Sequence, residues 1–234
     1  MAENIEHFIE LYKELEAAVR ITYKIDKKDS VAHYLTQQDK FSKYKEDILL
    51  CSDTRNLIQH GRTVNNDFIV QPTDQMIKFI TSLISKVKNR QKCSDIMIKI
   101  GDVYRGSMQG SVSESIDIMK EKAYTHVPIL ENRKVIGVFD ENSLFCFVSD
   151  GNSVSDSLTF ESIKKYLGLN NRECEGFLFA KKNEYVDEIE ESMNAAFKKQ
   201  KRIGMVFVTD TGDEDGKLLG ILTPWDIIAS YKEI

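Results

Sequence analysis

The chain has 234 residues, of which 41% are hydrophobic and 29% are charged, and its formal net charge is -5. This balance is typical of a protein that folds around a buried core, and the length suits two domains of roughly 100 to 150 residues better than one. An acidic chain has no overall positive field, which excludes a protein that gathers nucleic acid or anionic lipid through its net charge.

The sequence shows no sign of a membrane segment or a targeting peptide. No apolar run approaches the roughly 18 residues that a bilayer-spanning helix needs, and residues 1–20 carry several acids, unlike a targeting peptide. We therefore expect a cytoplasmic protein. The cysteines lie too far apart for a structural zinc site, and we interpret them as reduced, buried thiols: Cys51, Cys93, Cys146 and Cys174. The histidines outside residues 54–61 also lack a second ligand at metal spacing, so we predict no metal and interpret them as structural: His7, His33 and His126.

The first 92 residues carry the pattern of an all-helical domain. Apolar residues between positions 5 and 25 recur at helical spacing and predict a first long helix. Polar residues at 65–67, followed by Pro72, predict a loop before the last helix. Candidate N-caps precede three further helices: Asp29 or Ser30, Thr36 with Asp39 in a capping-box pattern, and Thr73 or Asp74.

The pattern changes near Ile96, where short β-branched runs begin to alternate with helices. Residues 127–139 and 205–222 each predict a β-hairpin with a helix before it and another after it, and Gly137 in the first corresponds to Gly220 in the second. The sequence therefore predicts a domain at 1–92 and an internal repeat over 95–234. We place the first repeat at about 95–150, a connecting segment at 151–175 and the second repeat at about 176–234.

Residues 220–226 of the second repeat read Gly-Ile-Leu-Thr-Pro-Trp-Asp. This turn resembles the strand-to-helix turn of the CBS domain family, and the two repeats together resemble its tandem pair. The resemblance implies β-α-β-β-α repeats. Together with the all-α bundle predicted for residues 1–92, they give an α+β fold. The resemblance also implies that the pair binds AMP, ADP, ATP or S-adenosylmethionine as a regulatory ligand, and not as a substrate.

The spacing of Thr223 and Asp226 suits such a ligand. The two residues lie three apart at a helix start, so that Asp226 can accept from ribose hydroxyls while Thr223 donates to phosphate. The alternative is that they only cap the helix. The resemblance adds further ligand-binding residues: Trp225, Ala180, Lys181, Val206 and Val208.

The first repeat departs from this pattern, since residues 137–143 read Gly-Val-Phe-Asp-Glu-Asn-Ser. Asp140 stands where the phosphate-binding Thr is expected, and Ser143 replaces the ribose-binding Asp. Because an acid repels phosphate, we expect the ligand cleft at this turn of the first repeat to be empty or to accept something else. One ligand per chain follows.

Residues 54–61 read Thr-Arg-Asn-Leu-Ile-Gln-His-Gly, and with the helix count they resemble the HEPN superfamily signature. The resemblance implies a metal-independent endoribonuclease with catalytic Arg55, Asn56 and His60. A histidine can move a proton near neutral pH, and an arginine can stabilise charge on phosphorus. On an ideal helix Arg55 points about 140° away from His60. One chain alone therefore makes a poor site, which favours a homodimer.

Together these patterns predict a nucleotide-sensing protein whose ligand occupancy regulates a helical domain that acts on RNA. The alternative is a non-catalytic adaptor that binds the nucleotide and docks a partner protein through the same helices.

Overall fold

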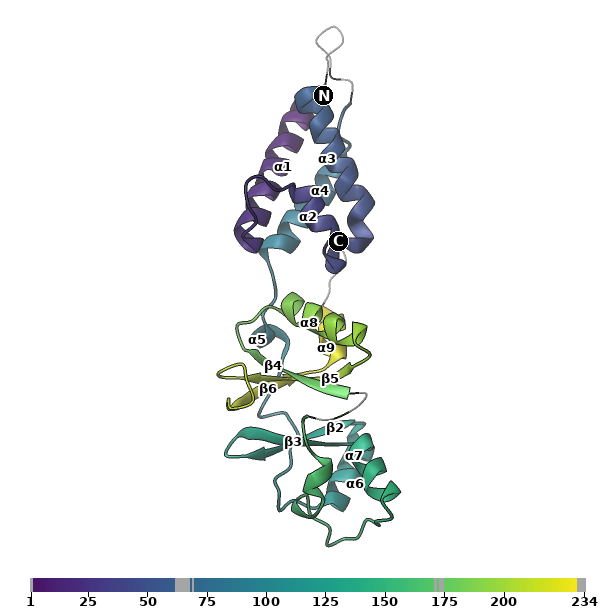
Figure 1. Ribbon diagram of the computed structural model, residues 1–234. Helices are drawn as coiled ribbons and strands as arrows, with labels where there is room; N and C mark the ends of the chain where they lie inside the picture. Colours follow the sequence, from purple (N-terminus) through teal and green to yellow (C-terminus); the bar gives the residue numbers. More distant parts are fainter. Residues whose placement is uncertain (1, 62–67, 69, 171, 173–174, 231–234) are drawn as a thin grey trace. The chain divides into compact units, whose positions relative to one another are not determined.

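The computed structural model describes residues 2–61, 68, 70–170, 172 and 175–230 (Figure 1). The chain forms two compact units, one that ends at Arg90 and one that begins at Gln91. The predicted loop residues 65–67 lie outside the described residues.

The first unit is helical, as the apolar spacing predicts, and Ser30 and Thr73 cap helices by accepting from backbone N–H groups at 3.3 and 3.2 Å. The predicted capping box at Thr36 is wrong. Thr36 is the last residue of its helix, and its hydroxyl donates to the carbonyl oxygen of His33 at 2.9 Å. The next helix instead has Gln38 as its N-cap residue, without a side-chain cap hydrogen bond. The elements are α1 (Ala2–Tyr23), α2 (Val31–Thr36), the 3-10 helix η1 (Asp39–Tyr44), α3 (Lys45–His60) and α4 (Asp74–Lys88).

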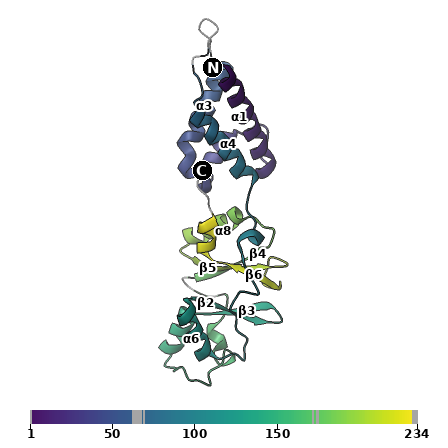
Figure 2. The same ribbon diagram turned by 180° about the vertical axis from the view of Figure 1, so that it is seen from behind.

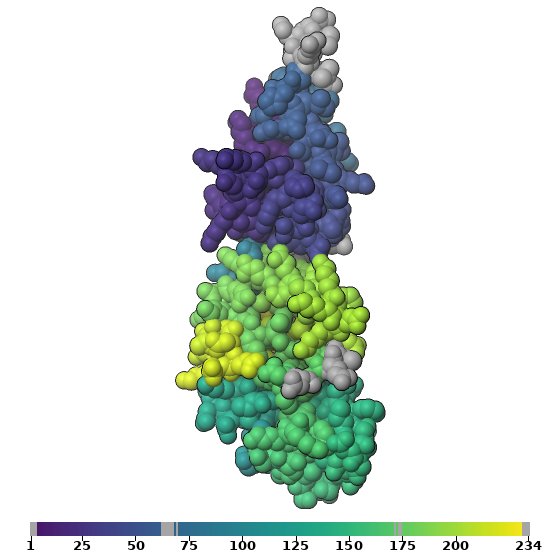
Figure 3. All heavy atoms as spheres, in the orientation of Figure 1, coloured from purple at the N-terminus to yellow at the C-terminus, as the bar shows by residue number. Residues whose placement is uncertain are grey.

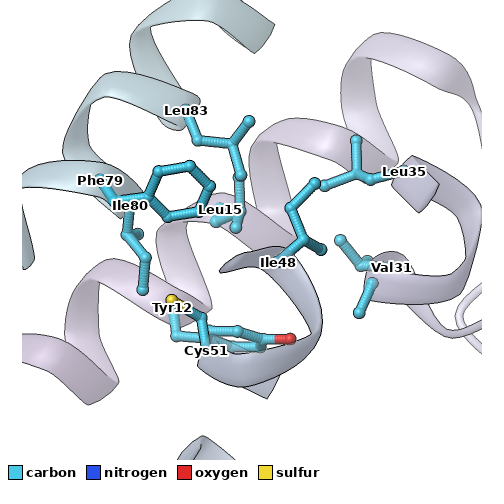
Figure 4. Close-up of a pocket in the computed structure, with 10 residues that line it drawn as sticks. Tyr12, Leu15, Val31, Leu35, Ile48, Cys51, Phe79, Ile80 and Leu83 are labelled. Atoms are coloured by element: carbon cyan, nitrogen blue, oxygen red, sulfur yellow. The ribbon is translucent and has the colours of Figure 1, made fainter. Parts of the chain in front are cut away.

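The core of the first unit contains a small apolar cavity, shown in Figure 4. Its volume is about 10 Å³, and side chains of α1, α2, α3 and α4 line it, among them Leu15, Cys51 and Leu83. A space of this size holds at most one water molecule. The cavity is therefore a packing defect of the core and not a ligand site.

The second unit contains two β-sheets (Figures 1 and 2). The four-stranded sheet has the order β1-β6-β5-β4, and the two-stranded sheet pairs β2 with β3. Strands β4 and β5 run parallel, and the other neighbours run antiparallel. The strands are β1 (Ile98–Lys99), β2 (His126–Glu131), β3 (Lys134–Asp140), β4 (Glu175–Lys181), β5 (Arg202–Thr209) and β6 (Leu218–Leu222). The helices are α5 (Cys93–Ile96), α6 (Val112–Lys122), α7 (Glu141–Ser149), the 3-10 helix η2 (Glu161–Tyr166), α8 (Val186–Lys198) and α9 (Pro224–Ser230).

Both predicted hairpins are confirmed. Asn132 and Arg133 form the β2–β3 turn with φ of 51° and 68°, the left-handed pair of a tight two-residue hairpin. The second hairpin joins β5 to β6. The ends of the two hairpins touch, because the amide of Leu218 donates to the carbonyl oxygen of Arg133 at 2.8 Å. Figure 3 shows yellow atoms of the second repeat against teal atoms of the first.

Three apolar layers hold the second unit together. One face of β5 and β6 packs against α5, α8 and α9. The opposite face, which includes Phe207 and Ile221, packs against Val135 and Val138 of β3. The far face of the β2–β3 sheet covers α6, α7 and η2. The sheets thus meet face to face between two helical layers.

Gly137 and Gly220 occupy equivalent environments, which supports the predicted repeat. A Cβ atom on Gly137 would lie 2.8 Å from the carbonyl oxygen of Leu167, and one on Gly220 would lie 2.5 Å from that of Ile98. In each repeat a neighbouring backbone segment therefore lies directly against the second hairpin strand, and only glycine leaves room for it.

Candidate functional site

The turn at Thr223 joins β6 to α9 in the second repeat. The backbone N–H of Thr223 and its hydroxyl both donate to Oδ2 of Asp226, each at 2.7 Å, and the N–H of Asp226 donates to Oγ1 of Thr223 at 3.3 Å. This reciprocal arrangement is a capping box, with Pro224 at the first helical position. Both side chains are half-buried. Oδ1 of Asp226 has no hydrogen-bond partner among the described residues, so that capping uses only one carboxylate oxygen.

The other predicted ligand residues differ in how their side chains lie. Ala180, Val206 and Val208 are fully buried in the core beneath α8 and α9 and expose neither side chain nor backbone. Val206 pairs with Leu222, the residue before the turn, whereas Ala180 lies on the far side of β5. Lys181 is exposed, and Trp225 is 77% exposed.

The corresponding turn of the first repeat is already occupied by the chain itself. Oδ1 of Asp140 accepts from the backbone N–H and the hydroxyl of Ser143, both at 2.7 Å, which caps α7. Arg172 donates to Oδ2 of Asp140 and also to the carbonyl oxygen of Val138, at 2.7 Å for the latter. Asp140 is therefore not an uncompensated acid, and the repulsion expected from the sequence needs correction. The guanidinium of Arg172 lies at this turn.

A second charged contact adjoins Arg172. Nε2 of His126 lies 2.9 Å from Oε1 of Glu175, and Nη1 of Arg172 lies 3.7 Å from Oε2. Burial acts to raise the pKa of Glu175, but the hydrogen bond to His126 and the charges of His126 and Arg172 outweigh it and lower the pKa. One atom each of His126, Asp140 and Glu175 lies within 4.8 Å of the others. Sequence spacing missed this cluster because its members come from three different strands.

The predicted catalytic residues of the first unit lie at the C-terminal part of α3. Nη2 of Arg55 lies 3.6 Å from Glu16 on α1, and Nη1 donates to Oδ1 of Asn56 at 3.0 Å. The guanidinium also lies 5.6 Å from the ring centre of Tyr12. His60 ends the helix and is exposed, and among the described residues no hydrogen bond joins it to Arg55 or Asn56. A single chain does not assemble the three side chains into one site.

The cysteines do not all match the expectation of buried thiols. Cys51 and Cys93 are buried, and burial raises the pKa of each to about 12. Cys146 is exposed on α7, which contradicts the prediction, and Cys174 lies outside the described residues.

Over the part of the chain that the structure describes, no helix has both the length and the apolar composition to cross a membrane.

Comparison with known proteins identifies the second unit. The family model for the CBS domain matches twice, at residues 93–150 and 179–233. Among curated proteins, no sequence matched the chain.

Several solved structures are similar to the same region at low identity. The CBS domain pair of protein MJ0100, in complex with 5'-methylthioadenosine and S-adenosyl-L-methionine, is 20% identical, with 60% of this chain and 95% of that chain covered and a TM-score of 0.44. A hemolysin-like CBS protein of Oenococcus oeni is 19% identical, over 60% and 90% of the two chains, with a TM-score of 0.42. CBSX2 in complex with AMP is 16% identical, over 59% and 94%, with a TM-score of 0.43.

The repeats thus match a known domain twice in succession, with two hairpins packed face to face. The C-terminal part of this chain is a tandem pair of CBS domains.

Proposed function

We propose that the CBS pair binds an adenine nucleotide or S-adenosylmethionine at the Thr223–Asp226 turn, and that occupancy of this site regulates the helical unit. CBS pairs typically bind such ligands in a regulatory role. The observation that carries the proposal is the free Oδ1 of Asp226 beside a hydroxyl donor in a half-buried turn.

The chemistry of this turn suits a ribose phosphate. Oδ1 of Asp226 can accept from the ribose hydroxyls while Oδ2 keeps its bond to the backbone N–H of Thr223. The Thr223 hydroxyl now donates to Asp226, and it can rotate to donate to a phosphate oxygen without breaking that backbone bond. Ligand binding therefore leaves the helix capped.

Calorimetric titration of the full chain with AMP, ADP, ATP and S-adenosylmethionine tests the site. Asp226→Asn keeps an oxygen for the cap and removes the charge, and we expect it to weaken binding about tenfold, since hydrogen bonds to a charged group contribute roughly 1.5 kcal/mol or more. The matched control is Glu214→Gln, which changes an exposed acid of the same repeat and should leave binding unchanged. Equal affinity in both variants, or no binding of any of the four ligands, would contradict the proposal.

Regulation requires more than binding, because a ligand shifts an equilibrium only through different affinities for its two states. Hydrogen–deuterium exchange along α3, with and without the ligand found by calorimetry, measures this coupling. A change in the protection of α3 amides supports regulation. Ligand binding with unchanged protection would support the binding site and contradict the regulation of the helical unit.

For the helical unit we propose metal-independent ribonuclease activity in a homodimer that brings Arg55 of one chain towards His60 of the other. The exposure of His60 supports access to RNA. The test is incubation with RNA in a chelator, beside His60→Ala, with the molar mass measured by light scattering. Equal product from both proteins, product from a monomer, or no product at all would remove the enzyme proposal.

The adaptor alternative has its own supporting observation. Leu49, Leu50 and Leu57 of α3 are 41%, 56% and 43% exposed, which suits an apolar contact with a partner protein. An adaptor would show ligand-dependent exchange in α3 without any RNA cleavage.

A further inference from the structure

The strands of the CBS pair bring one histidine and two carboxylates together at the junction of the two repeats. His126 begins β2 and Asp140 ends β3, and these two residues are direct partners across the hairpin. Glu175 begins β4 of the second repeat. One ligand atom from each lies within 4.8 Å of the other two. Two ligands of a tetrahedral zinc ion, each roughly 2.1 Å from the metal, lie roughly 3.4 Å apart, so small side-chain movements would bring all three onto one ion.

The cluster contains a buried acceptor without a partner. The carboxylates of Asp140 and Glu175 face the guanidinium of Arg172 and the imidazole of His126, and the side chains are largely buried, at 3% exposure for Asp140, 16% for Glu175 and 11% for Arg172. Oε2 of Glu175 is buried without a hydrogen-bond partner among the described residues, and Arg172 reaches it only at 3.7 Å. A buried acceptor that is left unpaired costs free energy. A cation bound beside it would remove that cost.

The backbone of β5 closes over the cluster. A Cβ atom on Gly204 would lie 2.6 Å from Oε1 of Glu175 and 2.7 Å from Nε2 of His126. Any other residue at this position would push the histidine and the carboxylate aside. The glycine thus allows two of the three ligand atoms to lie where they do.

We propose that His126, Asp140 and Glu175 form a binding site for a divalent transition-metal ion, with Arg172 as the internal cation that the metal displaces. One imidazole nitrogen with two carboxylate oxygens suits Zn²⁺ or Mn²⁺, with water at the remaining positions. The site is built from residues other than Thr223 and Asp226, and the metal proposal does not depend on the nucleotide proposal.

Arg172 would compete with a bound metal ion for the carboxylate of Asp140. Its Nη1 atom would have to leave Oδ2 of Asp140 when a metal binds. Its other bonds, from Nε to the carbonyl oxygen of Gly168 at 2.9 Å and from Nη2 to that of Val138 at 2.7 Å, go to groups outside the ligand set and can persist. Metal and guanidinium compete for the same oxygen, so that removing Arg172 should strengthen metal binding and removing a ligand should weaken it.

The experiment titrates the chelator-treated full chain with Zn²⁺ and Mn²⁺ by calorimetry, with Mg²⁺ as a comparison. We expect one Zn²⁺ per chain, at least tenfold weaker binding in His126→Gln and in Glu175→Gln, and about tenfold tighter binding in Arg172→Met. The control is His33→Gln, an exposed histidine of the first unit, which should bind as the unaltered chain does.

Thermal unfolding gives a second measurement, since Arg172→Met leaves the Asp140 carboxylate buried without its guanidinium partner. We expect this variant to unfold at a lower temperature without metal and to recover with Zn²⁺ by a larger shift than the unaltered chain shows. In addition, Co²⁺ bound to the unaltered chain should give visible absorption that Glu175→Gln lacks. No Zn²⁺ binding, binding unchanged in the ligand variants, or weaker binding in Arg172→Met would each overturn the proposal.

Discussion

Replacement of Gly220 by alanine tests how the start of the first repeat is joined to the second repeat. Gly220 of β6 pairs with Lys99 of β1, and the amide of Ile100 donates to the carbonyl oxygen of Leu219 at 2.9 Å. The added Cβ would lie 2.5 Å from the carbonyl oxygen of Ile98, a distance that real Cβ atoms do not adopt. Because the clash is with backbone, β1 must move away from β6.

The cost follows from two contributions. Overpacking in a tight region costs about 1 to 3 kcal/mol, and the loss of one backbone hydrogen bond costs about 1 kcal/mol. We therefore expect Gly220→Ala to lower the free energy of unfolding by about 2 to 4 kcal/mol, which corresponds to a fall of roughly 6 to 12 °C in melting temperature for a unit of this size.

Urea unfolding followed by far-UV circular dichroism measures the loss. The control is Gly101→Ala, because a Cβ atom there would meet nothing within 4 Å, and we expect it to change stability by about 0.5 kcal/mol or less. Faster hydrogen exchange at the amide of Ile100 in Gly220→Ala would locate the damage at the β1–β6 pairing. If the two glycine variants unfold at the same urea concentration, the steric reasoning is refuted.

Four further outcomes can each be checked by a separate measurement. Iodoacetamide should alkylate exposed Cys146 in the folded protein and spare Cys51, as peptide mass mapping would show. Because the folded pKa of Cys51 is raised from 9.0 to about 12, stability should be lost as the pH rises through that range, and Cys51→Ala should lose less in alkaline urea titrations. Leu83→Ala, next to the small cavity, should cost about 2 to 5 kcal/mol, whereas exposed Leu50→Ala should cost about 0.5 kcal/mol or less. Thr223→Val should cost about 1 kcal/mol through the lost cap, measured by thermal unfolding.

Local patterns in the sequence predict much of the fold. Apolar spacing predicts the long helices, and the alternation of short strands with turns predicts both hairpins and their repetition. Gly137 and Gly220 could be paired from sequence because each has to admit a neighbouring backbone. Thr223 and Asp226 are likewise brought together by their own helix start, which a spacing of three predicts.

Contacts between distant segments could not be predicted in this way. Arg172 reaches Asp140 across 32 residues, and His126 reaches Glu175 across 49. Nothing in the local spacing indicates such partners, because they meet only after both sheets have packed. The same reason applies to Cys146, whose exposure depends on which face of α7 the rest of the fold covers.

Because β1 pairs with β6, a strand from the start of the pair completes the sheet of the second CBS domain, and the two domains are not structurally independent. Cys93 and the short strand after it lie at the start of the first CBS match, yet they complete the core and the sheet edge of the second domain. During synthesis this segment cannot form its strand pairing until β6, more than a hundred residues later in the chain, has been made. A gene fragment that encodes the second domain alone would leave an open strand edge, which is a site for aggregation. The pair is therefore expected to fold, and to be inherited, as one piece.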